Sequence, residues 1–397
     1  MTTCALTIAA SLMIFPKAAY EASLRGLEMW WDVVFPSLLP FFIMSELLIG
    51  FGVVHLLGAV FEPFMRPLFR VPGAGGFVWA MGIASGYPAG AKLTARLRQE
   101  GQLTKLEAER LASFTNFSNP LFMFGAVAVG FFHNASLGLI LAASHYLGNF
   151  CVGLVMRFYG KGEERVYAFK GYRKASIRKA IDLIHHERQR DRRPLGKLLG
   201  DAVSSSVSTL LTIGGFVILF SVINRVFELL HITDGLAAIV SFILNQLHIP
   251  PELSHALVSG LFEITLGAQT ASQTDTFLFY QIMVTSFILA FCGFSVQAQV
   301  ASILADTDIR FKPFFLARGL HGIFASLFTL ILWNPLFVER TAGKSTVTVD
   351  TFETKTAFPV LQSAWEHLLH YGALVSFVAL LAYMAITIGK MKKNPLT

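Results

Sequence analysis

The chain contains eight apolar segments that are each close to the length needed to cross a lipid bilayer. About 20 apolar residues in a helix span the roughly 30 Å of hydrocarbon. The segments are residues 2–16, 33–57, 111–131, 135–156, 202–226, 276–303, 313–337 and 365–388. In hydrocarbon every backbone polar group must be hydrogen-bonded, and an α-helix achieves this within one segment. The sequence therefore predicts an all-α polytopic membrane protein with about eight transmembrane helices.

The composition supports this class. Hydrophobic residues make up 54% of the chain and charged residues 14%, with a mean hydropathy of +0.58. Soluble domains carry about a quarter charged residues, so much of this surface must face something other than water. The net charge of +7 does not indicate nucleic acid, because the basic residues gather in short segments between the apolar ones. No basic region precedes segment 2–16, which is therefore interpreted as a retained span and not as a signal peptide.

Basic residues between the apolar segments indicate which loops are cytoplasmic, because loops rich in Lys and Arg stay on that side. Residues 157–197 contain thirteen Lys or Arg against five Asp or Glu, and residues 390–393 are also basic. Residues 231–255 contain no Lys or Arg and suit the outer side. Counting spans from these loops predicts that both termini are cytoplasmic. The basic segment 157–197 is expected to form an amphipathic surface helix.

Two further apolar segments, 73–94 and 251–274, are too rich in Gly, Pro, Ser and Thr to be straight spans. The first has basic residues at both ends, so it is predicted to enter and leave on the cytoplasmic side as a re-entrant hairpin. The second follows the segment without basic residues and is predicted to enter from outside. Non-helical backbone at a hairpin tip survives in a membrane only where protein or water surrounds it.

The two hairpins belong to an internal repeat. Gly90-Ala91 recurs as Gly267-Ala268, and "FTNFS" at 114–118 recurs as "FCGFS" at 291–295, so both pairs share one offset (267 − 90 = 177 and 291 − 114 = 177). Because the hairpins enter from opposite sides, the halves are predicted to be inverted, as in many secondary transporters. The expected division is an N-terminal span and outer linker at 1–32, a first repeat at 33–131, a span and the basic loop at 132–201, a second repeat at 202–303, and C-terminal spans at 304–397.

Five motifs follow one another along the chain: "FPSLLPFFIMSELL", "GIASGYPAGAKLTARLR", "SFTNFSNPLFMFGAVA", "GLFEITLGAQTAS" and "FCGFSVQAQV". Together they resemble the Gate, or nucleoside-recognition, domain family, and the resemblance runs over residues 20–337. It implies a hairpin-containing core like that of the concentrative nucleoside transporters. Through a branch of the family in endospore-forming bacteria, it also implies movement of dipicolinic acid out of the mother cell across the outer forespore membrane.

A site for dipicolinate, a small planar ring with two carboxylates, needs N–H and hydroxyl donors, a cation, and apolar or aromatic walls. The hairpins and the helices that follow them contain such groups. The predicted substrate contacts are Ser85, Gly86, Tyr87, Gly90, Asn116, Ser118, Asn119, Glu263, Thr265, Gln269, Thr270, Ser295 and Gln297. Pro120 predicts a break in the backbone beside Asn119. A nucleoside would use the same amides and hydroxyls, so this residue set leaves the substrate open.

Three charged residues have two interpretations each. Lys92 either binds a substrate carboxylate or extends to the cytoplasmic interface. Glu263 either contacts the substrate or a coupling ion deep in the membrane, or makes a structural hydrogen bond to a hairpin amide. Glu46 has the same alternatives, near a helix end. His145 and Asn149, one helical turn apart on span 135–156, are expected to make satisfied polar contacts and not a proton relay.

The sequence has no catalytic constellation, no metal-ligand spacing and no cofactor-binding loop, so we expect neither an enzyme nor a metal or cofactor site. Cys4, Cys151 and Cys292 lie in apolar segments and are expected to behave as small hydrophobic side chains. The expected partners are a small anionic substrate and the bilayer, but not nucleic acid, and a homo-oligomer is compatible with the transporter class. The alternatives are a nucleoside transporter and a membrane scaffold for spore-envelope assembly that docks a partner through residues 157–197.

Overall fold

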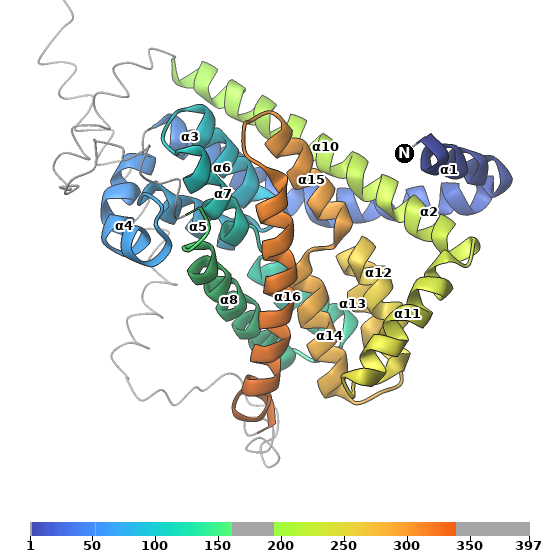
Figure 1. The fold of residues 1–397 in the computed structure, drawn as a ribbon. Coiled ribbons are helices and arrows are strands. Elements are labelled where there is room, and N and C mark those ends of the chain that lie inside the picture. Colours follow the sequence, from blue (N-terminus) through green and yellow to red (C-terminus); the bar gives the residue numbers. More distant parts are fainter. Residues whose placement is uncertain (1, 52, 161–193, 339–397) are drawn as a thin grey trace, which may run out of the picture. The chain divides into compact units, whose positions relative to one another are not determined.

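The computed structural model describes residues 2–51, 53–160 and 194–338, which form helices joined by short connections (Figure 1). Within these ranges no strand occurs, so the predicted all-α class is confirmed. The predicted segment 365–388 and most of the basic segment 157–197 lie outside the described residues.

The helices before the basic segment contain the first predicted repeat. They are α1 (Thr2–Ile14), α2 (Pro16–Met29), the π-helix η1 (Trp30–Val34), α3 (Phe35–Gly50), α4 (Val53–Phe69), α5 (Ala74–Ser85), α6 (Ala89–Gln99), α7 (Lys105–Thr115), the π-helix η2 (Phe122–Phe131) and α8 (Leu137–Met156).

The helices after the basic segment contain the second predicted repeat. They are α10 (Leu195–Leu229), α11 (Ile232–Gln246), the 3-10 helix η4 (Pro251–Leu253), α12 (Ser254–Phe262), α13 (Ile264–Gln273), α14 (Leu278–Phe291), α15 (Gly293–Ala305), α16 (Phe311–Trp333) and the π-helix η5 (Asn334–Val338).

Four helices of the described part are long and apolar enough to cross a membrane, and they correspond to the predicted spans 135–156, 202–226, 276–303 and 313–337. These helices are Leu137–Met156, Leu195–Leu229, Leu278–Ala305 and Phe311–Val338. The other predicted spans are shorter or interrupted: α3 ends at Gly50, and residues 116–119 separate α7 from η2. The first predicted span corresponds to α1, which is 13 residues long.

The helices that begin the two predicted repeats, α3 and α10, belong to a long antiparallel pair. Helices α2, η1 and α3 follow one another without a gap and pack along α10, as the blue and green ribbons of Figure 1 show. Gly26 lies against Ile218, and Gly50 lies against Leu198, so the two directions are opposite. Small residues at these contacts allow the helices to approach closely, as is common between membrane helices. The indole of Trp30 crosses the pair and donates a hydrogen bond to the Leu210 carbonyl at 2.9 Å.

The two repeats have the same order of elements. In the first, α5 and α6 form a hairpin broken at residues 86–88, and α7 is then interrupted at residues 116–119. In the second, α12 and α13 are broken at Glu263, and α14 gives way to α15 at Cys292 and Gly293. The breaks obey the offset found in the sequence (263 − 86 = 177 and 293 − 116 = 177). The opposite membrane orientation of the halves stays a prediction from the loop charges.

Two charged contacts join the loop at 306–310 to the first repeat. Arg98 donates from Nε and Nη2 to the two carboxylate oxygens of Asp308 at 2.9 and 2.8 Å. Arg310 donates from its backbone and its guanidinium to the buried Glu109 carboxylate at 2.8 to 3.1 Å. Glu109 also accepts a hydrogen bond from the Tyr159 hydroxyl at 2.9 Å. The predicted topology places the loop at 306–310 and the loop between α6 and α7 on the same, cytoplasmic side of the membrane. These contacts agree with that prediction.

The Asp308 contact predicts a pH dependence of stability. Hydrogen bonding and attraction by Arg98 lower the pKa of the Asp308 carboxyl below its ordinary value. The stabilisation is therefore fully present above about pH 4, the unfolded value for Asp, and is lost as the pH falls through the lower folded value. We expect the difference in thermal stability between the wild type and Asp308→Asn to be constant at neutral pH and to shrink below about pH 4.

This difference should be small, below about 1 kcal/mol, because the pair is largely exposed to solvent. Thermal unfolding of both proteins in detergent measures it between about pH 3 and about pH 7, a range that contains the ordinary pKa of Asp and the neutral plateau. A difference that widens on acidification would contradict the assignment.

Candidate functional site

In the first repeat the hairpin tip packs against the interruption of α7. Gly86 at the tip has a positive φ of 80°, which glycine adopts without strain, and it touches Asn119. The Asn119 side chain donates to the Ser85 carbonyl at 3.1 Å and accepts from the Phe122 amide at 2.8 Å. Asn119 thus binds both the hairpin tip and the start of the next helix, and it holds the predicted break beside Pro120 in place.

Two glycines allow both arms of this hairpin to approach the end of α7. A Cβ on Gly90 would lie 2.0 Å from the Thr115 carbonyl oxygen, and one on Gly82 would lie 2.5 Å from the same atom. Real Cβ atoms do not approach backbone oxygens so closely, so only glycine fits at these positions. The α7 break is therefore enclosed by hairpin backbone on two sides.

The second repeat has a corresponding arrangement. Glu263 has an extended backbone, and its side chain accepts a hydrogen bond from the Leu266 amide at 2.9 Å as the N-cap of α13. The hairpin arms touch where a Cβ on Gly267 would lie 2.2 Å from the Gly260 Cα. Gly293, in the α14–α15 break, lies against the Gly260 and Phe262 carbonyls. Glu263 thus makes the structural hydrogen bond that was one of its two interpretations.

The two repeats meet through a polar contact near their breaks, and a second polar contact lies beside it within the second repeat. The Tyr87 hydroxyl, from the first hairpin tip, donates to the Leu289 carbonyl in the last turn of α14 at 2.7 Å. The Gln297 amide, on α15, donates to the nearby Phe291 carbonyl at 3.0 Å. The tip of hairpin 1 therefore touches the helix interruption of the other repeat. We call this region, defined by Ser85, Tyr87, Asn116, Gln297 and Arg318, the crossing site.

Arg318, on α16, is the residue of the crossing site that the sequence analysis missed. Its guanidinium is fully buried and donates to the Asn116 carbonyl at 2.6 Å and to the Ser113 carbonyl. It also contacts His321 Nδ1 at 3.1 Å and lies over the Phe314 ring, 5.3 Å from its centroid. The available signal was a single Arg within an apolar helix, a position where charges are rare and usually functional.

Arg318 also reaches the second repeat. Its guanidinium lies near the Tyr87 hydroxyl and the Cys292 thiol. Since Cys292 marks the α14–α15 break and Asn116 marks the α7 break, the cation lies between the two interruptions.

Several polar atoms of the crossing site are buried without a hydrogen-bond partner. They are Ser85 Oγ, both polar side-chain atoms of Asn116, Gln297 Oε1 and Arg318 Nε. Buried polar groups in proteins are nearly always paired, because an unpaired one loses its interactions with water without replacement. Unpaired buried atoms also occur elsewhere in the described residues, as at Ser206 and Thr285, but these five lie on residues that adjoin or contact the helix breaks. They are candidate partners for a small polar solute or water.

The other predicted site residues lie in several environments. Lys92 pairs with Glu46 at 3.2 Å and lies over Phe42, while Ser205 of α10 donates to Glu46 at 3.0 Å. These two charges therefore neutralise each other. The Ser118 amide donates to His145 at 3.0 Å, and Asn149 donates to the Phe114 carbonyl.

Not all of the predicted contacts lie at the crossing site. Gln269 is exposed on α13, and the Thr270 hydroxyl donates to the Leu266 carbonyl within that helix. Thr265 and Ser295 are buried in the first turns of α13 and α15, respectively.

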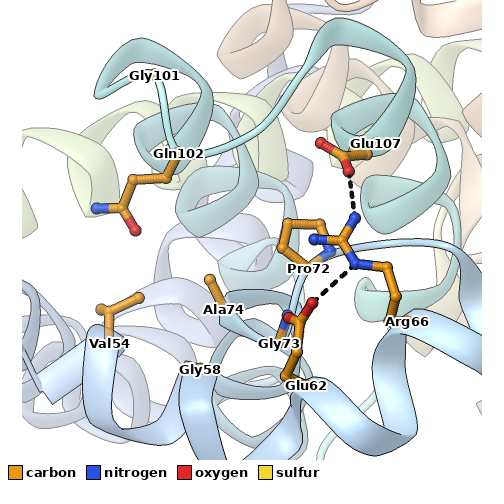
Figure 2. Close-up of a pocket in the computed structure, with 10 residues that line it drawn as sticks. All are labelled: Val54, Gly58, Glu62, Arg66, Pro72, Gly73, Ala74, Gly101, Gln102 and Glu107. Carbon is orange, nitrogen blue, oxygen red and sulfur yellow. Dashed lines mark hydrogen bonds and ion pairs between the residues drawn. The ribbon is translucent and has the colours of Figure 1, made fainter. Parts of the chain in front are cut away.

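A separate cavity of about 190 Å³ lies between α4, the start of α5 and the α6–α7 loop. Figure 2 shows Arg66 at one side of it, between Glu62 and Glu107, with Val54 and Gln102 at the other side. Arg66 pairs with both carboxylates at 2.8 Å. None of the predicted substrate contacts lines this cavity.

The fold and the crossing site define an integral membrane protein with a helix-break core, and the comparisons agree with this class. Residues 31–135 match the Gate family, described as nucleoside recognition. The sporulation integral membrane protein YlbJ of Bacillus subtilis (strain 168) is 55% identical over 384 residues, which cover 96% of this chain and 93% of that protein. An uncharacterized protein of Alkalihalophilus pseudofirmus is 33% identical over 89 residues, covering 22% of this chain and 19% of that protein. No solved structure matches the chain.

The identity to the Bacillus protein extends over nearly the full length of both chains. This chain therefore belongs to the family of the sporulation integral membrane protein YlbJ.

Proposed function

We propose that this protein transports a small planar dicarboxylate, dipicolinic acid, across the outer forespore membrane during sporulation. The observation that carries the proposal is the crossing site, where two helix interruptions from two repeats meet around buried, unpaired polar atoms. Transport would proceed by alternating access, as the two-hairpin core moves and opens the site to each side in turn.

Physical reasons favour a transport site over a structural defect. Interrupted helices expose backbone groups that cost several kcal/mol each in hydrocarbon, roughly, if nothing pairs with them. Two interruptions at one place concentrate this cost, together with the unpaired side chains of Asn116 and Gln297. A polar solute that passes through the site would supply the missing partners. A protein that only packed helices together would not need this arrangement.

The substrate class is supported by the donors and the cation of the site. Amide, hydroxyl and guanidinium groups bind carboxylates, and the Tyr87 and Phe314 rings offer surfaces for a planar molecule. The relative's name places that protein in sporulation, which supports a substrate of the developing spore.

Nucleoside transport is the second candidate, because the matching family is described as nucleoside recognition. The side chains of Asn116 and Gln297 could bind a base or ribose equally well. A scaffold that docks a spore-envelope partner through residues 157–197 is a third candidate, and that segment lies largely outside the described residues.

Uptake of radiolabelled dipicolinate into proteoliposomes that contain the purified protein separates these candidates. We expect saturable uptake that uridine and adenosine do not inhibit. Inhibition by nucleosides, with nucleoside uptake in place of dipicolinate uptake, would favour the second candidate. No flux of either compound through folded, inserted protein would contradict transport. Deleting the basic segment should then abolish the scaffold's role in spores, whereas a transporter lacking it should retain flux.

A further inference from the structure

Arg318 presents an energetic problem that its present contacts solve only in part. The guanidinium is completely buried, and its helix is long and apolar enough to cross a membrane. In the described part of the chain, no carboxylate forms an ion pair with it. Its partners are two carbonyls, a histidine nitrogen, the Tyr87 hydroxyl and an aromatic ring. Arg318 Nε has no partner. A buried charge without a counterion is strongly unfavourable, so one expects an anion to bind there at some stage.

A structural role explains some of these contacts. Carbonyls at a helix C-terminus carry partial negative charge, and a cation placed there is stabilised. Arg318 thus caps α7 through the Ser113 and Asn116 carbonyls. This role does not explain the bare Nε, nor the Asn116 side chain, whose amide nitrogen and oxygen are both unpaired at 0% exposure.

The neighbouring groups complete a surface for an anion. The unpaired Asn116 side chain belongs to the same residue whose backbone carbonyl Arg318 binds. The Tyr87 hydroxyl interacts with the same guanidinium. His321 Nδ1 contacts the Arg318 guanidinium, and His321 Nε2 is itself hydrogen-bonded to the His145 carbonyl at 2.8 Å. In this structure only Arg318 Nε is without a partner, while Nη2 donates to the Ser113 carbonyl. If that carbonyl were released, Nε–H and Nη2–H would form the pair of parallel donors that suits a carboxylate.

We infer that Arg318 is the specificity-determining residue of the crossing site and binds one carboxylate of the substrate, assisted by the Asn116 amide. The inference rests on the proposed transport function and assigns the charge preference to one side chain. Binding would exchange a carbonyl of α7 for the substrate carboxylate. Those carbonyls belong to the end of α7, which the hairpin of α5 and α6 encloses. Anion binding would therefore weaken the contact between this hairpin and α7, which has to change during the proposed transport.

The test compares charged and neutral ligands of one shape. The probes are dipicolinate, picolinate with one carboxylate, and the neutral pyridine-2,6-dicarboxamide, each used to compete with labelled dipicolinate uptake. The wild type should prefer dipicolinate over the diamide by at least about 100-fold, as expected for charge-assisted hydrogen bonds. Arg318→Gln should raise the KM by about 100-fold and reduce this preference to below about tenfold.

Two further variants keep the test decisive. Arg318→Lys keeps the charge but loses the paired N–H donors of the guanidinium, so its KM should rise about tenfold while the preference for anions remains. Arg225→Gln removes a partly exposed arginine that pairs with Glu228 on α10, and it should behave as the wild type. A monodisperse Arg318→Gln protein with wild-type KM and preference would overturn the inference. If that variant does not fold, an unchanged KM in Arg318→Lys would do so.

Binding measured without transport separates this inference from the proposed function. Ligands that bind the folded state raise its melting temperature. A wild type that is stabilised by dipicolinate but not by the diamide, without uptake, would refute transport and retain the anion site. A wild type that shows neither uptake nor stabilisation by either acid would overturn both.

Discussion

Alanine at Gly90 is expected to reduce dipicolinate uptake at least about 100-fold and to destabilise the protein by about 1–3 kcal/mol, the usual cost of overpacking. Its Cβ would lie 2.0 Å from the Thr115 oxygen and 2.4 Å from the Thr115 carbonyl carbon. Both atoms belong to the backbone, so no side-chain rotation relieves the clash. The hairpin would have to move away from the α7 break, and the crossing site would lose its enclosure.

Gly215→Ala is the matched control, because a Cβ at this α10 position meets no heavy atom within 4 Å. Uptake should be unchanged, and stability should be equal or slightly higher, since alanine favours a helix over glycine by about 1 kcal/mol. Uptake rates and thermal unfolding in detergent measure both effects. Wild-type behaviour of Gly90→Ala would show that hairpin 1 does not pack against α7 as described.

Asn116→Leu is expected to impair transport without a loss of stability. Leucine has nearly the same shape as asparagine, and the polar atoms it removes have no partner in the folded protein. Replacing unpaired buried polar groups by apolar atoms of the same shape is close to neutral or stabilising. The substrate would lose an amide contact, so the KM should rise at least about tenfold.

Thr285→Val serves as the control for this prediction. Thr285 is fully buried on α14, and its hydroxyl is also unpaired, but it lies outside the helix breaks. Its replacement should leave both the KM and the melting temperature unchanged. If Asn116→Leu lost stability but kept a wild-type KM, the Asn116 side chain would be a structural element and not a substrate contact.

The sequence pattern was informative about the helix breaks. Gly, Pro and Ser residues predict them locally, and the shared offset of 177 residues relates the breaks of the two halves. The contacts between breaks were not predictable, because they depend on packing between distant segments. Arg318 binds a carbonyl 202 positions earlier in the chain, and no local pattern encodes that contact.

The predicted site residues show the same limit. Lys92 and Glu46 were each identified as charged candidates, but their pairing with each other required the packing of α3 against the first hairpin. Gln269 is only a few residues from the hairpin tip, yet the helical turn of α13 directs it to the exposed side. Closeness in sequence to a break therefore did not ensure a place in the crossing site.

The antiparallel pair of α10 with α2, η1 and α3 has a consequence for how the protein sits in a bilayer. Helix α10 alone has 35 residues and extends over about 52 Å, whereas the hydrocarbon layer is roughly 30 Å thick. Such a hydrophobic mismatch is relieved by tilt or by letting one end project. Lys17, Glu21, Arg25 and Glu28 are exposed along α2, and Lys197 is exposed at the opposite end of the pair, so both ends carry charges that suit the membrane surface. Charges at both ends hold such a pair at one depth, so in the proposed transport mechanism any displacement across the bilayer would fall to the hairpins.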